Sequence, residues 1–219
     1  MSTSTQPSYV FRYFNVPGLG ETSRLLLLAS GSKWTEENPE WPQEKPNQPF
    51  GRLPVLVEKS AAGSPGFVLS ESGSIERYLA RRHGFLPSDP RKAALQEQLR
   101  DQFADVISSY LPIASYNYDN GRKKFEELLA KLKEVLPNAL KNNGSSVDPE
   151  SGKITYIDLY VYGMLKSIIL ISADKNPEYA TLFKDLCTPV VAKMISNVHA
   201  HPSLQAQVAN DKKIFTFLA

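Results

Sequence analysis

Residues 49–57 read PFGRLPVLV, and they say most about the architecture of this chain. Residues 55–57 are apolar, which predicts a short strand, and Pro54 stands at its start, where no ladder N–H is needed. A proline directly before a strand leaves the backbone N–H and C=O of the preceding residue, Leu53, exposed. An extended peptide can pair with these groups as an added strand. The motif therefore predicts a strand end that binds a short peptide.

The segments on either side add groups that bind anions. The sequence ESGSIERYL at residues 71–79 opens a helix with Glu71 and Ser72. Unpaired N–H groups and the positive end of the helix dipole at such a start accept a carboxylate. Upstream, Trp41 and Lys45 can supply an indole N–H and an ammonium group for a second carboxylate. Together these segments predict a site for a small peptide with two carboxylates.

The motifs W-P-x-x-K-P, P-F-G-x-L-P-V-L and E-S, in this order and spacing, resemble those of the cytosolic glutathione transferases, most closely the sigma class. The resemblance extends from Tyr9 to the C-terminal helix. It implies a tyrosine-type transferase that joins the thiolate of glutathione to small hydrophobic electrophiles, with glutathione as co-substrate and no other cofactor. A glutathione-dependent isomerase or peroxidase of the same fold remains an alternative. A non-catalytic, crystallin-like binding or structural relative is another.

The N-terminal part alternates strand and helix signals, whereas the rest is helical in pattern. Residues 9–14 and 67–69 predict strands like that at 55–58, residues 32–36 a weaker one, and residues 21–30 and 72–83 predict helices. This order, together with the resemblance, predicts a thioredoxin-like α/β domain at residues 7–86.

The second domain begins after the linker LPSDP at residues 86–90. Apolar residues recur at helical spacing over residues 91–108, and no strand signal follows. We therefore expect an all-helical domain at residues 90–219 that contributes the electrophile site. Within it, Thr155 and Asp158 have the spacing of a capping box at a helix start, which the resembling family also carries.

Tyr13 is the candidate for thiol activation. A free thiol has a pKa of about 8.5, so a hydrogen bond that favours the thiolate is needed at neutral pH. The run Tyr-Phe-Asn-Val at residues 13–16 matches the strand end where tyrosine-type classes keep their catalytic tyrosine. An ordinary sheet aromatic is the alternative interpretation of Tyr13, and Tyr9 alternates onto the same face. Residues 15–20 contain neither the Ser nor the Cys of other classes.

The resemblance assigns the remaining contacts residue by residue, although each residue could instead be an ordinary core, loop or helix-start residue. Two departures stand out, because Arg52 occupies a position that is usually Gln and Leu19 one that is often Arg. The glutathione contacts it implies are Phe14, Trp41, Lys45, Arg52, Leu53, Pro54, Glu71, Ser72 and, reaching into the neighbouring subunit's site, Asp105. The electrophile contacts it implies are Asn15, Val16, Tyr110, Pro112, Ile113, Tyr116, Phe215 and Phe217.

Composition narrows the function classes further. The chain has 25 Lys and Arg against 23 Asp and Glu, which gives no basic excess for binding nucleic acid or a membrane surface. No apolar run approaches the length of a membrane span, and the three histidines do not cluster with Cys or acidic residues at metal spacing. A single cysteine, Cys187, excludes an intramolecular disulfide. We expect a cytoplasmic homodimer without a metal ion.

Overall fold

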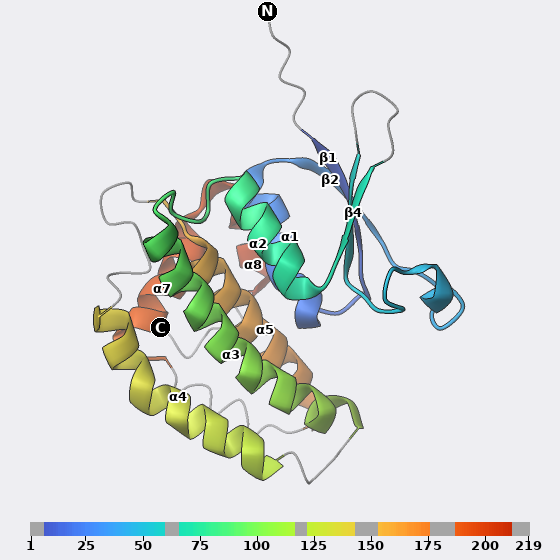
Figure 1. Ribbon diagram of the computed structural model, residues 1–219. Helices are drawn as coiled ribbons and strands as arrows, with labels where there is room; N and C mark the ends of the chain where they lie inside the picture. The colour runs from blue at the N-terminus through green and yellow to red at the C-terminus, as the bar shows by residue number, and fades with distance from the viewer. Residues whose placement is uncertain (1–6, 60–65, 117–121, 143–152, 176–186, 212–219) are drawn as a thin grey trace, which may run out of the picture. The chain divides into compact units, whose positions relative to one another are not determined.

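The chain, seen in a computed structural model that describes residues 7–59, 66–116, 122–142, 153–175 and 187–211, forms two compact units (Figure 1). The units are Met1–His83 and Gly84–Ala219. The first combines strands and helices, whereas the described part of the second contains helices only. The predicted fold class, a thioredoxin-like domain followed by a helical one, is confirmed.

A four-stranded mixed sheet organises the first unit, in the order β2-β1-β3-β4. The central strand β1 (Ser8–Arg12) runs parallel to β2 (Lys33–Glu37) and antiparallel to β3 (Val55–Lys59). The edge strand β4 (Phe67–Ser70) is antiparallel to β3. The strand predicted at residues 32–36 is therefore present as β2.

Two helices, α1 (Glu21–Ser30) and α2 (Ser72–Arg82), pack against each other beside this sheet (Figure 1). The predicted bounds of α1 match, since Gly31 ends it with the left-handed φ of 67° that favours glycine. Fully buried side chains from both layers form the core of this unit, among them Phe11, Leu25, Leu26, Leu56, Ile75 and Leu79.

The first strand is shorter than the sequence predicts. The strand expected at residues 9–14 ends at Arg12, so Tyr13 and Phe14 lie just beyond it. The Tyr13 N–H still donates to the Glu37 carbonyl at 3.1 Å, which continues the sheet by one bond. Tyr13 therefore stands where the sheet gives way to the loop before α1.

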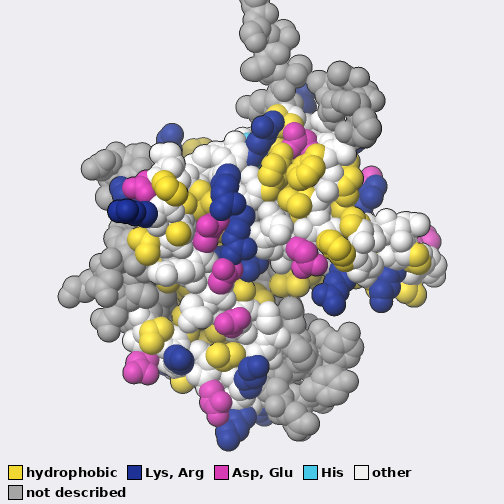
Figure 2. Space-filling view, in the orientation of Figure 1, with side chains coloured by type: hydrophobic (Ala, Val, Ile, Leu, Met, Phe, Trp, Pro, Cys, Tyr) yellow, Lys and Arg dark blue, Asp and Glu magenta, His cyan; other side chains and the backbone are white. Residues whose placement is uncertain are grey.

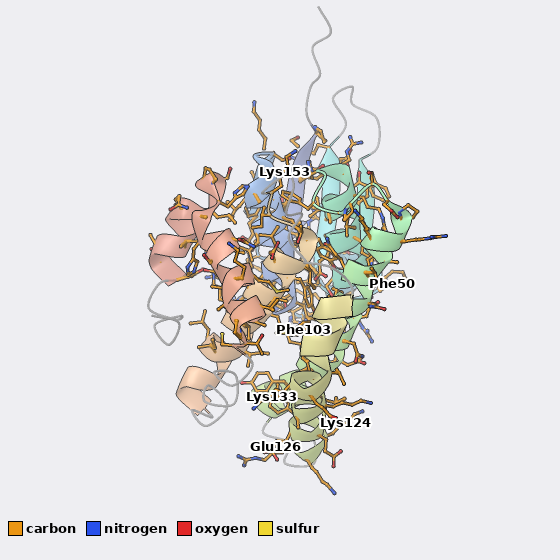
Figure 3. All side chains as sticks on the ribbon, turned by 90° about the vertical axis from the view of Figure 1, so that its left-hand side faces the viewer. Phe50, Phe103, Lys124, Glu126, Lys133 and Lys153 are labelled. Atoms are coloured by element: carbon orange, nitrogen blue, oxygen red, sulfur yellow. The ribbon has the colours of Figure 1, made fainter. Side chains whose placement is uncertain are left out.

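Five α-helices and one short 3-10 helix, Pro202–Leu204, make up the described part of the second unit. The long helix α3 packs against both α4 and α5, and α5 packs against α7. Phe103, on α3, is only 2% exposed and lies among these helices (Figure 3). The helices are α3 (Pro90–Tyr116), α4 (Arg122–Asn142), α5 (Tyr156–Lys175), α7 (Pro189–Ala200) and α8 (Gln205–Asp211).

The start of α5 carries the predicted capping box. The Thr155 N–H donates to Asp158 Oδ2 at 2.9 Å, as the spacing predicts. The Thr155 hydroxyl also donates to this oxygen, at 2.7 Å. Burial raises the pKa of Asp158 to about 6, although both hydrogen bonds from Thr155 oppose this rise. This buried cap fixes the first turn of the central helix of the unit.

Candidate active site

Tyr13 is enclosed by the turn that follows it in sequence. Its side chain is buried, and its hydroxyl oxygen accepts a hydrogen bond from the Leu19 N–H at 3.0 Å. Leu19 is the middle residue of a short 3-10 helix, Gly18–Gly20. A Cβ on Gly18 would lie 2.7 Å from the Tyr13 hydroxyl, and one on Gly20 would lie 2.4 Å from the ring. Only glycines at these two positions let the backbone approach the tyrosine so closely.

The electrostatics of Tyr13 suit a hydrogen-bond donor. Burial raises the pKa of this phenol, while the Leu19 N–H and the positive charge of Arg24 lower it in part. The hydroxyl therefore keeps its proton at neutral pH. Because its oxygen is the acceptor in the bond from Leu19, the proton can still be donated to another group. A neutral donor of this kind can stabilise a thiolate.

Tyr9, the competing tyrosine, is engaged elsewhere. Its hydroxyl is hydrogen-bonded to His83 Nε2 at 3.0 Å, just beyond the last turn of α2. Tyr13 lies at the other end of β1, beyond Arg12. The structure thus places the hydroxyls of the candidate, Tyr13, and of its competitor, Tyr9, in different surroundings.

Two aromatic residues implied as glutathione contacts meet in the first unit. The ring of Phe14 packs edge-on against that of Trp41, with centroids 5.5 Å apart. Trp41 is half-buried and is followed by a cis peptide bond to Pro42. Lys45 is exposed and begins a 3-10 turn, Lys45–Asn47, with Gly51 packed beside its side chain. The loop thus carries an indole and an ammonium group near the start of β3.

The start of α2 has an unusual backbone. Glu71, its N-cap, is the one residue other than glycine with a positive φ, 71°, in the described part of the chain. Such a conformation costs about 1–3 kcal/mol and is typical of ligand-binding positions. Ser72 follows as the first helical residue. At the same end of the neighbouring strand β3, whose Val55 pairs with Ser70, half-buried Leu53 precedes the buried Pro54 through a cis peptide bond.

The structure brings most of the predicted glutathione contacts into the first unit, but not Asp105. This residue is exposed on α3 of the second unit. Arg52 is exposed in the loop before β3. Their part in binding stays a prediction.

The predicted electrophile contacts belong to both units. Asn15 and Val16 are exposed in the loop after β1, whereas Tyr110 is fully buried with its ring 5.1 Å from that of Phe125 in the helical unit. Tyr110 is thus a core residue of that unit, and a role in the pocket stays a prediction. The side chains of Pro112, Ile113 and Tyr116 on α3, and all of Phe215 and Phe217, lie outside the described residues.

Sequence reasoning missed two parts of this site. The first is the backbone N–H of Leu19, which no side-chain motif encodes, although two glycines flanking one residue shortly after a tyrosine are a usable signal. The second is Arg24 on α1, whose guanidinium carbon lies 5.5 Å from the centroid of the Tyr13 ring. Its position, three residues into an amphipathic helix, resembles that of any surface arginine.

Other chemistry has little support in the described residues. No group of three or more His, Cys, Asp or Glu side chains there is placed to hold a metal ion. None of the helices traced there combines the length and hydropathy that a membrane span requires. Cys187 is half-buried before α7, where burial raises the pKa of its thiol to about 11. Such a thiol is a poor nucleophile at neutral pH.

Comparison with known proteins agrees with this geometry. The family profile described as glutathione S-transferase, N-terminal domain, matches residues 9–81. Glutathione S-transferase 1 of Ascaris suum is 31% identical over 173 residues, covering 74% of this chain and 80% of the relative. Hematopoietic prostaglandin D synthase of Gallus gallus is 29% identical over 180 residues, covering 80% and 87%.

A solved structure extends the likeness to both units. Monomeric Na-GST-3, a glutathione S-transferase from the hookworm Necator americanus, has a TM-score of 0.68 and 26% identity. The match covers 93% of this chain and 97% of that one. The fold and the site describe a thioredoxin-like enzyme with a helical second domain. The chain belongs to the glutathione S-transferase family.

Proposed function

We propose that the protein is a glutathione transferase that conjugates the glutathione thiolate to small hydrophobic electrophiles. The observation that carries this proposal is the buried hydroxyl of Tyr13, which accepts the Leu19 N–H and keeps its own proton for donation. In the reaction, the thiol of glutathione loses its proton to solvent and the hydroxyl donates a hydrogen bond to the resulting thiolate. The sulfur then forms a bond to an electrophilic carbon, which expels a leaving group or opens a ring or double bond.

The backbone around the site supports a bound tripeptide. Leu53, two residues before β3, would pair with the extended backbone of glutathione. Glu71 and Ser72 at the start of α2 would bind its γ-glutamyl end, with the carboxylate near the positive end of the helix. Trp41 and Lys45 would donate to the carboxylate of the glycine end. Phe14 would support Trp41 through their ring contact.

Two measurements on the purified chain test this function. Retention on glutathione-agarose and elution by free glutathione are expected, together with conjugation of a generic aromatic electrophile at neutral pH. Retention without turnover of any electrophile would favour the binding or crystallin-like alternative. Failure of both would overturn the proposal.

A second candidate activity is glutathione-dependent isomerisation. A relative that matches 80% of this chain is named hematopoietic prostaglandin D synthase, which supports this alternative. The same thiolate can add to a peroxide or an enone, so isomerase, peroxidase and transferase activities need one and the same Tyr13 hydroxyl. A substrate panel of aryl halide, endoperoxide and hydroperoxide separates them, by the substrate with the highest kcat/KM.

We also propose that the enzyme is of the sigma type. The support is the sequence W-P-x-x-K-P at residues 41–46 together with a tyrosine at position 13. Relatives named for the P and mu classes also match the chain. A strong preference for a prostaglandin-type endoperoxide in the panel would favour the sigma type, and its absence would count against it.

Finally, we propose that the working form is a two-fold dimer. Apolar side chains are exposed over the region of β4 and α2 (Figure 2), and Phe50, in the loop before β3, is 69% exposed (Figure 3). Exposed apolar groups of this kind are typical of interfaces. Asp105 would then reach the ligand of the neighbouring subunit, and Arg77 would face Asp101 across the axis.

Sedimentation at micromolar concentration should give about twice the chain mass of 24.4 kDa. Asp105→Ala should weaken glutathione binding without dissociating the dimer. One relative, the hookworm Na-GST-3, is described as monomeric. A fully active monomer here would overturn the dimer proposal and leave the transferase proposal standing.

A further inference from the structure

The guanidinium of Arg24 joins three parts of the first unit. It donates to the carbonyl oxygen of Phe14 at 2.8 Å and to that of Val16 at 2.7 Å, with a longer contact to Pro17 at 3.3 Å. From the other side, its Nε donates to Glu36 of β2 at 2.8 Å. The side chain is only 14% exposed. One half-buried cation from α1 therefore holds the loop after β1 against the edge strand β2.

This loop leads directly into the turn that encloses Tyr13. The loop at residues 14–17, three of whose carbonyls bind Arg24, is followed by Gly18–Gly20, whose central N–H donates to the Tyr13 hydroxyl. The guanidinium also faces the Tyr13 ring, 5.5 Å from its centroid. Arg24 thus lies over the Tyr13 ring and also holds the loop that leads to the N–H donor of the Tyr13 hydroxyl.

Few acidic side chains in the described part of the chain lie close to Arg24. Two carboxylates face it: Glu36 on β2, and Glu21 on its own helix at 3.3 Å. Glu37, the next residue of β2, pairs instead with Arg12 at 2.7 Å. At position 19 this chain has Leu19, which carries no charge. Arg24 is therefore the cation that the Tyr13 phenol senses.

We propose that Arg24 is a positioning residue for the thiolate-stabilising hydroxyl: it clamps the loop at residues 14–17 and faces the Tyr13 ring, with Glu36 setting how much of its charge reaches the phenol. This inference rests on the proposed function of Tyr13. Arg24 itself does not contact glutathione. Its effect on the reaction passes through Tyr13 and therefore disappears when the hydroxyl is absent.

The test is the pH dependence of kcat/KM for a generic aromatic electrophile at saturating glutathione, which reports the apparent pKa of the thiol in the enzyme–glutathione complex. Arg24→Gln should raise this pKa by about half a unit to one unit. The positive charge of Arg24 favours the thiolate that accepts the Tyr13 hydrogen bond, and Gln removes that charge. Glu36→Gln should lower it by about a few tenths of a unit, because it removes a negative charge that offsets Arg24. General loosening of the fold cannot produce shifts of opposite sign.

Three further variants complete the design. Arg24→Lys keeps the charge but has fewer donors for the loop, so kcat/KM should fall about 3–10-fold at every pH while the apparent pKa stays within about 0.3 units. Arg12→Gln is the matched control, since Arg12 also pairs with a carboxylate of β2 but binds neither the loop nor Tyr13. Its profile should match that of the wild type. In a Tyr13→Phe background, Arg24→Gln should shift the pKa no further.

Several outcomes would overturn the inference. These are an unchanged profile for Arg24→Gln, an Arg24→Gln shift that persists in the Tyr13→Phe background, or Glu36→Gln moving the pKa upward. If Arg24→Gln does not fold, the signs for Glu36→Gln and Arg24→Lys decide. Full activity of Tyr13→Phe alone would instead overturn the proposed role of Tyr13, so the two failures are distinguishable. Thermal unfolding of each variant separates loss of fold from loss of positioning.

Discussion

The two ends of the first unit each hold a buried tyrosine, and only one end has the layout of a thiol site. Tyr9 and Tyr13 stand four residues apart along the β1 direction, with 1% and 6% of their side chains exposed. The Tyr9 hydroxyl bonds to His83 at the end of α2, beside Glu58. The Tyr13 hydroxyl receives a backbone N–H and lies near a cation.

Burial is the largest cause that raises the pKa of both phenols, so burial does not distinguish them. The charge of Glu58 raises the pKa of Tyr9 further, although Arg82 opposes it, whereas Leu19 and Arg24 lower that of Tyr13. Tyr9 thus has a carboxylate and a guanidinium beside it, whereas the groups named beside Tyr13 are a backbone N–H and a guanidinium, both of which would attract a thiolate. The neighbours of a hydroxyl, and not the residue type, decide which tyrosine can do this chemistry.

The largest expected effect comes from removing one hydroxyl at a time. Tyr13→Phe should lower kcat about 10–1000-fold, as for loss of a single donor to a developing anion, with little change in glutathione affinity. Tyr9→Phe should leave kcat within about twofold, because its hydroxyl bonds to His83 instead. Steady-state kinetics and equilibrium glutathione binding measure both. Equal losses of kcat in the two variants would show that Tyr9 and Tyr13 do not differ in their part in the reaction.

The next effect tests how tightly the backbone must approach Tyr13. A Cβ at Gly20 would lie 2.4 Å from the ring, so Gly20→Ala must displace the tyrosine or the turn. Unfolding free energy should fall by about 1–3 kcal/mol, as for overpacking, and kcat should fall at least about tenfold. Gly31→Ala is the control, since a Cβ there meets nothing within 4 Å although its φ is 67°. It should cost stability without lowering kcat.

A smaller effect separates backbone strain from charge at the start of α2. Glu71→Gly should stabilise the fold by about 1 kcal/mol, because relief of a strained φ outweighs the added freedom of the unfolded glycine. Glu71→Gln keeps the strain and should leave the unfolding free energy within about 0.5 kcal/mol. Both variants should weaken glutathione binding, measured by calorimetry. Undiminished binding in both would exclude Glu71 from the site.

Much of the fold was predictable because it depends on local signals. Gly31 ends α1 where the sequence predicts, and Pro54 marks the start of β3. The end of β1 was misplaced, because Tyr13 and Phe14 have high strand propensity although they continue the sheet by only one bond. Strand propensity is a property of a single residue, whereas the end of β1 is set by its pairing with the neighbouring strand β2.

The site was less predictable, for a related reason. Motifs and resemblance indicate side chains such as Trp41 and Ser72, but the groups that distinguish Tyr13 are a backbone N–H and the guanidinium of Arg24. Both depend on how the loop at residues 14–17 folds. Tertiary contacts of this kind leave no periodic signal in the sequence.

The smallest expected effect concerns pH at the Tyr9 end. Burial, and then the charge of Arg82, lower the pKa of His83 below its usual value of 6.5, so the folded state prefers the neutral ring. Its contribution to stability is therefore complete above pH 6.5 and is lost as the pH falls through 6.5 toward the folded-state pKa. A neutral His83 Nε2 can accept the Tyr9 hydroxyl proton, whereas a protonated one cannot.

His83→Gln replaces the titratable acceptor with an amide oxygen that can still accept from Tyr9. Between pH 7 and pH 5, the unfolding temperature of the wild type should fall relative to that of this variant. The difference between the two unfolding temperatures separates the effect of His83 from that of two other titrating groups. Burial also lowers the pKa of His201, which acts in the same direction, and raises that of Asp158 to about 6, which acts in the opposite one. Both are unchanged in the variant. Parallel pH curves would show that the Tyr9–His83 bond has no pH-dependent part in stability, leaving Tyr13 as the tyrosine whose surroundings matter.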